Sequence, residues 1–207
     1  MRKQLSVFVL AALAGMAIAI GGAVYLSMES KLAGALLFSV GLYTICVHGL
    51  NLFTGKVGYA PLQPPAYWGT LGIIWLGNWA GTWLAAEAMR LTRVGAGLAE
   101  KAAALCETKL ADSPLSLFLL GIFCGILMYA AVEGYKRTTN PLILFAGVSV
   151  FILCGFEHCI ADMYYFSMAG LWSGRALLYT LAITAGNALG GMLIPLGGMV
   201  SKENTSK

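Results

Sequence analysis

Two ionisable residues stand directly after a long apolar run. Glu157 and His158 follow residues 142–156, which contain no Asp, Glu, Lys or Arg. An ionisable side chain in hydrocarbon is costly without a partner, so residues placed there are candidates for function. Imidazole titrates near neutral pH and can offer a hydrogen bond or a proton to a weak-acid anion. We predict that His158 lines a pore, whereas Glu157 turns sideways into the protein, accepts backbone N–H bonds and fixes the shape of a broken helix.

A threonine and a second histidine occupy the first half of the chain. Thr54 lies in a region that we predict to break a helix, and we expect its hydroxyl to face His158 across the pore. The two side chains would then form a polar layer between apolar residues. His48 lies one turn before that break. A neutral histidine packed between helices is the expected state of His48.

The composition of the chain indicates the surroundings of these side chains. Of its 207 residues 59% are hydrophobic and only 11% are charged, and the mean hydropathy is +0.79. Soluble domains carry about 25% charged residues. The length allows one transmembrane domain over residues 1–207. The 13 Lys and Arg residues are scattered between the apolar runs, never more than two together, which argues against nucleic-acid binding.

The cysteines do not form a pattern that binds metal. Four of the five lie in or beside apolar segments, and Cys106 lies in a region that we predict to be a polar loop. No CxxC motif and no His/Cys pair with ligand spacing is present. We therefore expect reduced, packed thiols, no disulfide framework, no metal, no cofactor and no enzyme activity.

Six apolar stretches are long enough to cross a membrane as helices. They cover residues 5–28, 32–55, 57–86, 113–132, 138–156 and 176–201. Each is close to or above the ~20 residues that a transmembrane helix needs. The first is too long for the apolar part of a signal peptide and has no small-residue cleavage site, so we predict a mature helix. Seven Lys and Arg residues on the side of the termini, against six opposite, favour cytoplasmic termini.

The second and fifth spans are predicted to be broken near the middle of the membrane. Residues 54–56 and three prolines follow the second apolar run, and the next helix is expected to open near Trp68. Residues 157–162 follow the fifth run, and the apolar stretch 163–172 is too short to cross alone. Irregular backbone at that depth persists only where it is buried in protein or lines a cavity.

The two halves of the chain carry similar motifs at a nearly constant offset. Gly77-Asn78 and Gly81 match Gly186-Asn187 and Gly190, 109 positions later. Leu37-Phe38 matches Leu144-Phe145 at an offset of 107, and Ala14-Gly15 matches Cys124-Gly125 at 110. With three spans in each half, the second copy must enter the membrane upside down. This pattern predicts inverted 3+3 repeats, roughly residues 1–95 and 110–201, with a pore between them.

The sequence resembles the formate/nitrite transporter family, and the matching residues cover nearly the whole chain in order. They are Leu52-Phe53-Thr54-Gly55, Gly77-Asn78, Gly121 to Cys124, Gly155-Phe156-Glu157-His158 with Ala161 and Met163, and Gly186-Asn187 to Gly190-Gly191. The resemblance implies an all-α pentamer of aquaporin-like protomers, each with its own anion pore. It also implies that His158 is the central pore residue, with Thr54 as its partner. Leu42, Phe53 and Phe151 are the implied constriction residues.

The resemblance also assigns two lysines to the vestibules. Lys109 stands where the family has a lysine before the fourth span, and Lys3 fits one at the start of the first span. Such cations would draw anions toward the pore. Taken without the resemblance, both lysines read as ordinary flanking residues whose stems lie along the apolar surface.

The sequence departs from the family pattern at four positions. Asn51 replaces an acid before Leu52, and we assign Asn51, with Glu157, to the support of the helix breaks. Gly125 replaces an Asn, Cys159 a Ser and Asp162 an Asn. Because of these changes, the sequence does not determine the width and polarity of the pore near His158. It therefore does not determine the substrate.

The resulting hypothesis is a channel or proton-linked carrier in the inner membrane. Its expected partners are protons, the lipid bilayer, four further copies of the chain and a small monovalent anion such as formate, nitrite, hydrosulfide or a short-chain carboxylate. A neutral-solute channel is the alternative, although paired Asn-Pro-Ala motifs are absent. A membrane redox protein using His48, His158 and the cysteines, and a structural subunit without flux, are further alternatives.

Overall fold

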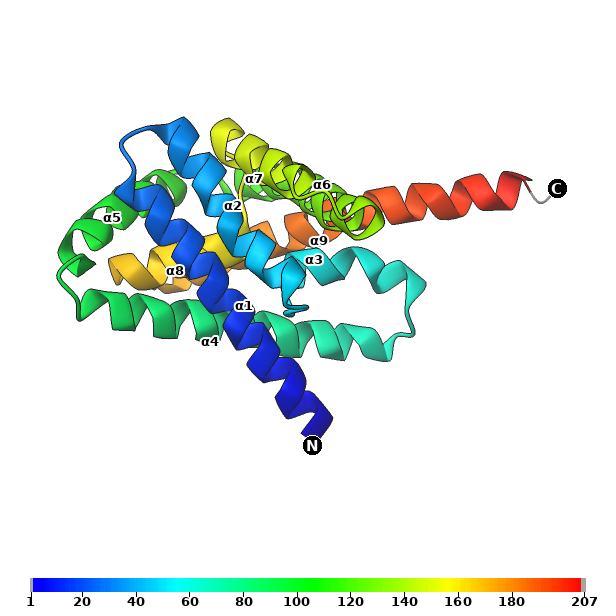
Figure 1. The fold of residues 1–207 in the computed structure, drawn as a ribbon, viewed down its shortest axis with the longest axis horizontal. Coiled ribbons are helices and arrows are strands. Elements are labelled where there is room, and N and C mark those ends of the chain that lie inside the picture. The colour runs from blue at the N-terminus through cyan, green and yellow to red at the C-terminus, as the bar shows by residue number, and fades with distance from the viewer. Residues whose placement is uncertain (1, 206–207) are drawn as a thin grey trace.

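The computed structural model describes residues 2–205, with side chains through residue 201, and contains no strand among them (Figure 1). The helices are ordered so that long ones are separated by one to three shorter ones. They are α1 (Arg2–Ser27), α2 (Lys31–Val47), α3 (Phe53–Lys56), the 3-10 helix η1 (Val57–Leu62), α4 (Ala66–Arg90), α5 (Gly95–Ala111), α6 (Pro114–Thr138), α7 (Leu142–Cys154), α8 (Cys159–Ala169) and α9 (Gly174–Thr205). The prediction of an all-α chain is confirmed for the described residues.

Three of the helices are long and apolar enough to cross a membrane. They are α1, α6 and the part of α9 that covers Gly174–Ser201. Helices α7 and α8 together form a fourth candidate span, which is bent by 59° at its break. The shorter α2 is apolar over 17 residues. These helices place the chain in a membrane.

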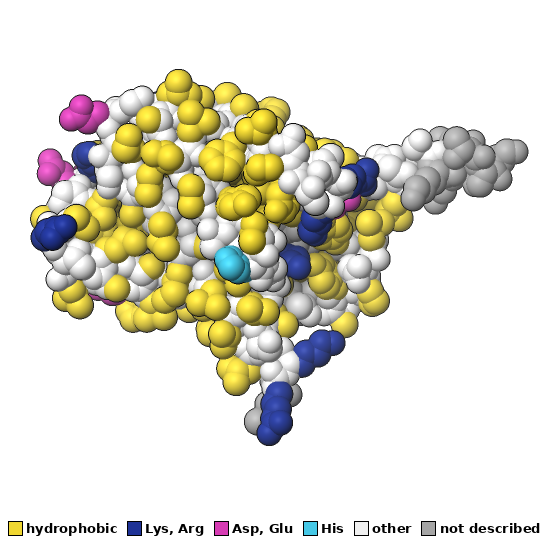
Figure 2. Space-filling model, in the orientation of Figure 1, with side chains coloured by type: hydrophobic (Ala, Val, Ile, Leu, Met, Phe, Trp, Pro, Cys, Tyr) yellow, Lys and Arg dark blue, Asp and Glu magenta, His cyan; other side chains and the backbone are white. Residues whose placement is uncertain are grey.

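The outside of the bundle is largely apolar. Figure 2 shows hydrophobic side chains over most of the visible face, with charged side chains toward its left and right and on the projection at the bottom. Exposed leucines occur on most helices, including Leu5, Leu76, Leu115, Leu142 and Leu178. In water this surface would drive aggregation, whereas lipid tails are as apolar as leucine. The exposed surface therefore fits a bilayer.

Helix pairing follows the same scheme in both halves of the chain. The first long helix packs on the third in each half, α1 on α4 and α6 on α9. Helices α2 and α7 pack against each other and join the halves. The short α8 packs on α4 and α5 (Figure 1).

Glycines bring the paired backbones into direct contact. A Cβ atom on Gly81 of α4 would overlap the carbonyl oxygen of Ala12, and one on Gly190 of α9 would overlap that of Ile122. Small residues of this kind allow the close approach on which helix association in lipid depends. The glycines that match between the halves therefore serve the same packing role.

Replacing Gly190 by leucine should strongly destabilise the bundle, because the new side chain meets backbone that cannot move aside. Overpacking costs about 1–3 kcal/mol or more. We expect the midpoint of thermal unfolding in detergent to fall by roughly 5–10 °C. The control is Gly197→Leu on the same helix, where an added side chain meets open space. Equal midpoints for the two variants would contradict this packing.

The prediction of a polar loop around Cys106 is wrong. Residues Gly95–Ala111 form α5, and Cys106 is fully buried. Leu98, Ala102 and Cys106 recur every fourth residue and form a buried stripe. This spacing places all three on one face of a helix, and α5 packs on α8. The charges between these residues concealed the stripe in the sequence.

Both helix breaks begin earlier than the sequence predicted. Helix α2 ends before Gly49, which has a φ of 64°, and α7 ends before Gly155, with a φ of 71°. Glycine adopts this left-handed conformation without strain, so it terminates the helix. Helical structure resumes at Phe53, so α3 covers residues 54–56, which were predicted to be irregular, and again at Cys159 within 157–162. Helix α4 begins at Ala66, two residues before Trp68, where it was expected.

Candidate functional site

The two helix breaks meet through one hydrogen bond in the interior of the protein. The Oγ1 atom of Thr54 lies 2.9 Å from Nε2 of His158. Both residues are buried, with 1% and 2% of their surface exposed. Thr54 belongs to α3 and His158 directly precedes α8, so each stands at the point where a helix restarts. The structure thus brings these two predicted residues together.

The tautomer of His158 follows from its second hydrogen bond. His158 is the N-cap of α8, and the backbone N–H of Ala161 donates to its Nδ1 atom at 3.1 Å. A ring nitrogen that accepts a hydrogen bond carries no proton, so the proton of the neutral ring is on Nε2. Nε2–H therefore points at Thr54 Oγ1, which accepts. The cap fixes both the orientation of the ring and the direction in which it donates.

The first break is held by a buried asparagine from α4. The Oδ1 atom of Asn78 accepts from the backbone N–H of Phe53 at 2.9 Å. Its Nδ2 donates to the carbonyl oxygens of Ala11 and Asn51, both at 2.8 Å. One side chain thus satisfies two backbone groups of the break, on Asn51 and Phe53, and ties the break to the Ala11 carbonyl in the middle of α1.

The second break is held in the same way by a buried asparagine from α9. The Oδ1 atom of Asn187 accepts from the backbone N–H of Cys159 at 2.9 Å. Its Nδ2 donates to the carbonyl oxygens of Gly121 and Glu157, both at 2.8 Å. Sequence reasoning matched the two Gly-Asn pairs but assigned no role to either asparagine. The recurrence of the Gly-Asn pair in the second half of the chain could have indicated that both asparagines have the same structural role.

The residues predicted to support the breaks make other contacts with their side chains. Asn51 Nδ2 donates to the carbonyl oxygen of Val7 at 3.3 Å and so joins the first break to α1. The carboxylate of Glu157 contacts the ammonium group of Lys109, while its backbone carbonyl accepts from Asn187. Glu157 therefore contributes to the break through its main chain, and its side chain belongs to an ion cluster.

This ion cluster consists of Lys109, Glu157 and Asp162. Lys109 Nζ reaches from α5 to the Glu157 carboxylate and lies 2.9 Å from Oδ1 of Asp162. The cluster lines a cavity of about 300 Å³ together with His158 and Phe151. We call this cavity the α5 vestibule. Lys109 thus lines this cavity, and two carboxylates face its single positive charge.

A smaller cavity of about 60 Å³ lies beside the first break. Its lining includes Leu42, Leu52 and Gly55, together with Lys56 and Lys136. We call it the Lys56 cavity. Sequence reasoning did not single out Lys56 or Lys136, although Lys56 directly follows the Leu-Phe-Thr-Gly motif.

The three predicted constriction residues are buried around the two breaks. Leu42 has no exposed surface and lines the Lys56 cavity. Phe151 stacks on the His158 ring, with the ring centroids 5.6 Å apart and an angle of 20° between the planes. Phe53 is buried at the start of α3, where Asn78 binds its N–H group. Of the three, Phe151 thus packs directly on the His158 ring, and Phe53 precedes Thr54 in α3.

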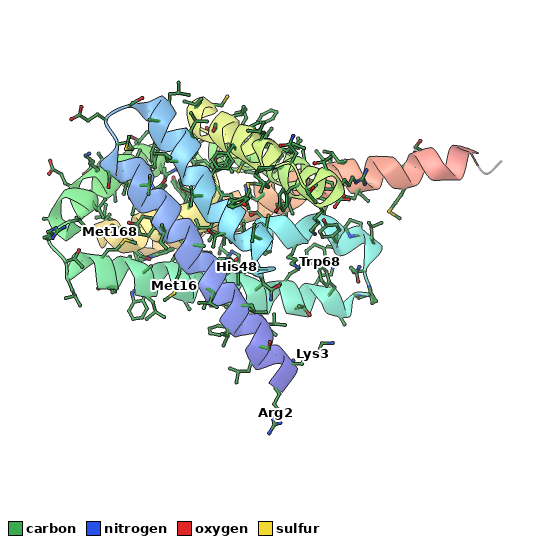
Figure 3. The ribbon with its side chains drawn as sticks, viewed as in Figure 1. Arg2, Lys3, Met16, His48, Trp68 and Met168 are labelled. Carbon is green, nitrogen blue, oxygen red and sulfur yellow. The ribbon has the colours of Figure 1, made fainter. Side chains whose placement is uncertain are left out.

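Two predicted residues lie at the surface. Lys3 is exposed on the first turn of α1, which projects from the bundle (Figure 3). His48 is exposed at the end of α2 (Figure 3), so the prediction that it packs between helices is wrong. Helix α2 ends at Val47, and the turn through His48 and Gly49 directs the imidazole outward.

Comparison with known proteins gives consistent matches. The family model for formate/nitrite transporters matches residues 1–200. The formate channel FocA of Haemophilus influenzae is 29% identical over an alignment of 159 residues that covers 67% of this chain and 54% of that protein. FocA of Escherichia coli K12 is 29% identical over an alignment of 195 residues that covers 81% of this chain and 67% of that protein. The nitrite transporter NirC of E. coli K12 is 27% identical over 177 residues, with 74% and 65% covered.

These relatives are channels and transporters, not enzymes, and the chain spans between about half and two thirds of their length. A solved pentameric formate channel with formate bound has the same fold, with a TM-score of 0.79 at 24% identity. The match covers 100% of this chain and 99% of that one. An ion channel of the FNT family gives a TM-score of 0.78 at 23% identity, over 96% and 89% of the two chains. The chain belongs to the formate/nitrite transporter family.

Proposed function

We propose that this protein carries small monovalent anions of weak acids across the membrane, with the Thr54 and His158 pair as the polar station of its pore. The observation that supports the proposal most strongly is the 2.9 Å contact that joins the two breaks inside an apolar bundle. Polar side chains are costly to place inside a membrane, so residues that form such a layer are candidates for function. The family relationship makes an anion the expected solute.

The direction of the imidazole N–H group suggests how an anion would pass. The Nε2–H of His158 points at Thr54, and a carboxylate or nitrite oxygen in that layer would replace Thr54 as its acceptor. Hydrogen bonds to charged acceptors are roughly twice as strong as neutral ones. An anion that shares this proton loses part of its charge, which offsets the cost of removing its water between Leu42 and Phe151. Transport is therefore linked to protons.

The proposed assembly is a homopentamer of six-span protomers in the inner membrane, with both termini cytoplasmic. The parallel roles of Asn78 and Asn187, together with those of Gly81 and Gly190, support inverted 3+3 repeats. The exposed apolar surface leaves room for both lipid and neighbouring copies. A pentameric formate channel has the same fold, which supports five copies.

Stopped-flow measurements on proteoliposomes test the proposed function. The solutes are formate, nitrite, hydrosulfide, acetate and butyrate, with glycerol and urea as neutral solutes, each at an acidic and a neutral pH. We expect flux of at least one anion above that of protein-free vesicles, with faster uptake at acidic pH. Passage of the neutral solutes with exclusion of all anions would instead indicate a neutral-solute channel. Absence of flux for every solute would contradict transport.

A further inference from the structure

The ion cluster beside the pore contains more negative than positive charge. Two carboxylates, on Glu157 and Asp162, contact one ammonium group, that of Lys109. Only 1% of the surface of Asp162 and 7% of that of Glu157 is exposed. Two like charges this close and this poorly hydrated repel each other strongly. With both carboxyl groups ionised, the cluster carries one unbalanced negative charge at the wall of the α5 vestibule.

One oxygen atom of this cluster has no partner. Oδ1 of Asp162 lies 2.9 Å from Lys109 Nζ, whereas Oδ2 is buried without a hydrogen-bond donor among the described residues. A buried carboxylate oxygen without a donor is unfavourable, since it has lost its water and gained nothing. Protonation of this oxygen would remove the charge that lacks a partner. Oδ2 of Asp162 is therefore the atom of the cluster to which a proton would bind.

The groups that face the cluster do not supply a second cation. The neighbouring titratable groups are His158 at the second break, Cys106 on α5, Tyr25 on α1, Cys124 on α6, and Cys159 and Tyr165 on α8. The cysteines and tyrosines are uncharged in their ordinary protonated states, and the His158 ring, which accepts a hydrogen bond at Nδ1, is neutral. Lys31 lines the same cavity, but its ammonium group donates to the carbonyl of Leu153 and does not contact the carboxylates. Arg90 contacts Glu87 and Ser167, and Arg175 donates to Tyr179. Within residues 2–201, Lys109 is the one cation in contact with these carboxylates.

We propose that Asp162, together with Glu157 and Lys109, forms a proton-binding site that controls the access of anions to His158. Without the proton, the net negative charge of the cluster repels anions from the α5 vestibule. With one proton on the carboxyl pair, the cluster is neutral and the vestibule admits them. This inference rests on the proposed function, because it concerns the same pore. It also gives a role to Asp162, one of the positions at which this chain departs from the family pattern.

Asp162→Asn removes the excess charge while keeping the shape of the side chain. We expect this variant to transport formate at neutral pH roughly tenfold faster than the unmodified protein, since a charged cleft changes the local concentration of ions by about 10-fold or more. At acidic pH the two should be equal. The ratio of the two fluxes at each pH cancels the change in the substrate's own ionisation. Glu107→Gln on α5 is the control, because it removes an exposed negative charge from the same helix.

A pH-dependent ratio for Asp162→Asn, with a ratio near one for Glu107→Gln, supports the site. A ratio for Asp162→Asn that does not change with pH would overturn it. Infrared difference spectra between the two pH values test proton binding without any transport. The C=O band of a protonated carboxyl group should increase on acidification, be lost in Asp162→Asn and be retained in Glu107→Gln. An identical band in all three proteins would exclude the site, even if the protein carried no anion at all.

Discussion

His158→Phe will abolish acid-dependent uptake of weak-acid anions by proteoliposomes. Phenylalanine can retain the stacking on Phe151, but it has no N–H group to offer to an anion. A hydrogen bond to a charged group contributes about 1.5–3 kcal/mol, so we expect anion flux to fall by roughly 10- to 150-fold. The variant also lacks the N-cap that binds Ala161, which costs about 1 kcal/mol of stability. Stopped-flow uptake across a pH series measures the effect.

Two further variants separate the role of the N–H group from that of the cap. His158→Asn keeps an N-cap and an N–H donor but does not titrate, so we expect it to fold normally while its flux loses proton dependence. His48→Phe changes the other histidine, which is exposed at the end of α2, and should behave like the unmodified protein. If His158→Phe kept the original pH dependence, His158 would not be the proton-sharing residue.

Asn187→Leu will prevent stable folding of the second half of the bundle. The substitution keeps the branching of the side chain but leaves the N–H of Cys159 and the carbonyl of Glu157 without their partner, and it removes the bond to the Gly121 carbonyl of α6. Unsatisfied buried polar groups cost about 1–3 kcal/mol each, so the loss for the two groups of the break is on the order of 2–6 kcal/mol. That is a large part of the stability of most proteins. The yield of monodisperse protein and its thermal unfolding in detergent measure the effect.

Asn140→Leu is the matched control for this prediction. Asn140 is exposed before α7, and its side chain accepts one local hydrogen bond, from the backbone N–H of Leu142. We expect its removal to lower stability by about 1 kcal/mol or less. Similar unfolding midpoints for the two leucine variants would show that Asn187 does not hold the break.

The class of the fold and the centre of the site were predictable because they depend on local composition. Long runs without charge predict apolar helices, and the only ionisable residues that directly follow the fifth run, Glu157 and His158, stood out against it. The motif match between Gly77-Asn78 and Gly186-Asn187 predicted that the two halves are built alike. In the structure both asparagines hold a helix break through three hydrogen bonds.

What escaped prediction depends on contacts between distant residues or on backbone conformation. The positions of the breaks are set by the left-handed conformation of Gly49 and Gly155. The chain contains 24 other glycines, and the sequence does not show which of the 26 adopt this conformation. The contact of Lys109 with Glu157 spans 48 positions, and no local pattern indicates it. In the sequence, Asp162 stood out only as a departure from the family pattern. The structure shows that it forms an ion pair with Lys109.

Simultaneous measurement of formate uptake and internal pH tests the central claim most directly. Proteoliposomes loaded with a pH-sensitive dye are given an inward formate gradient, and the signal of protein-free vesicles is subtracted. The account predicts that each formate enters with one proton, so acidification matches uptake and an imposed membrane potential changes neither. Formate uptake that proceeds without acidification and accelerates with an inside-positive potential would show passage of the bare anion and contradict proton sharing at His158.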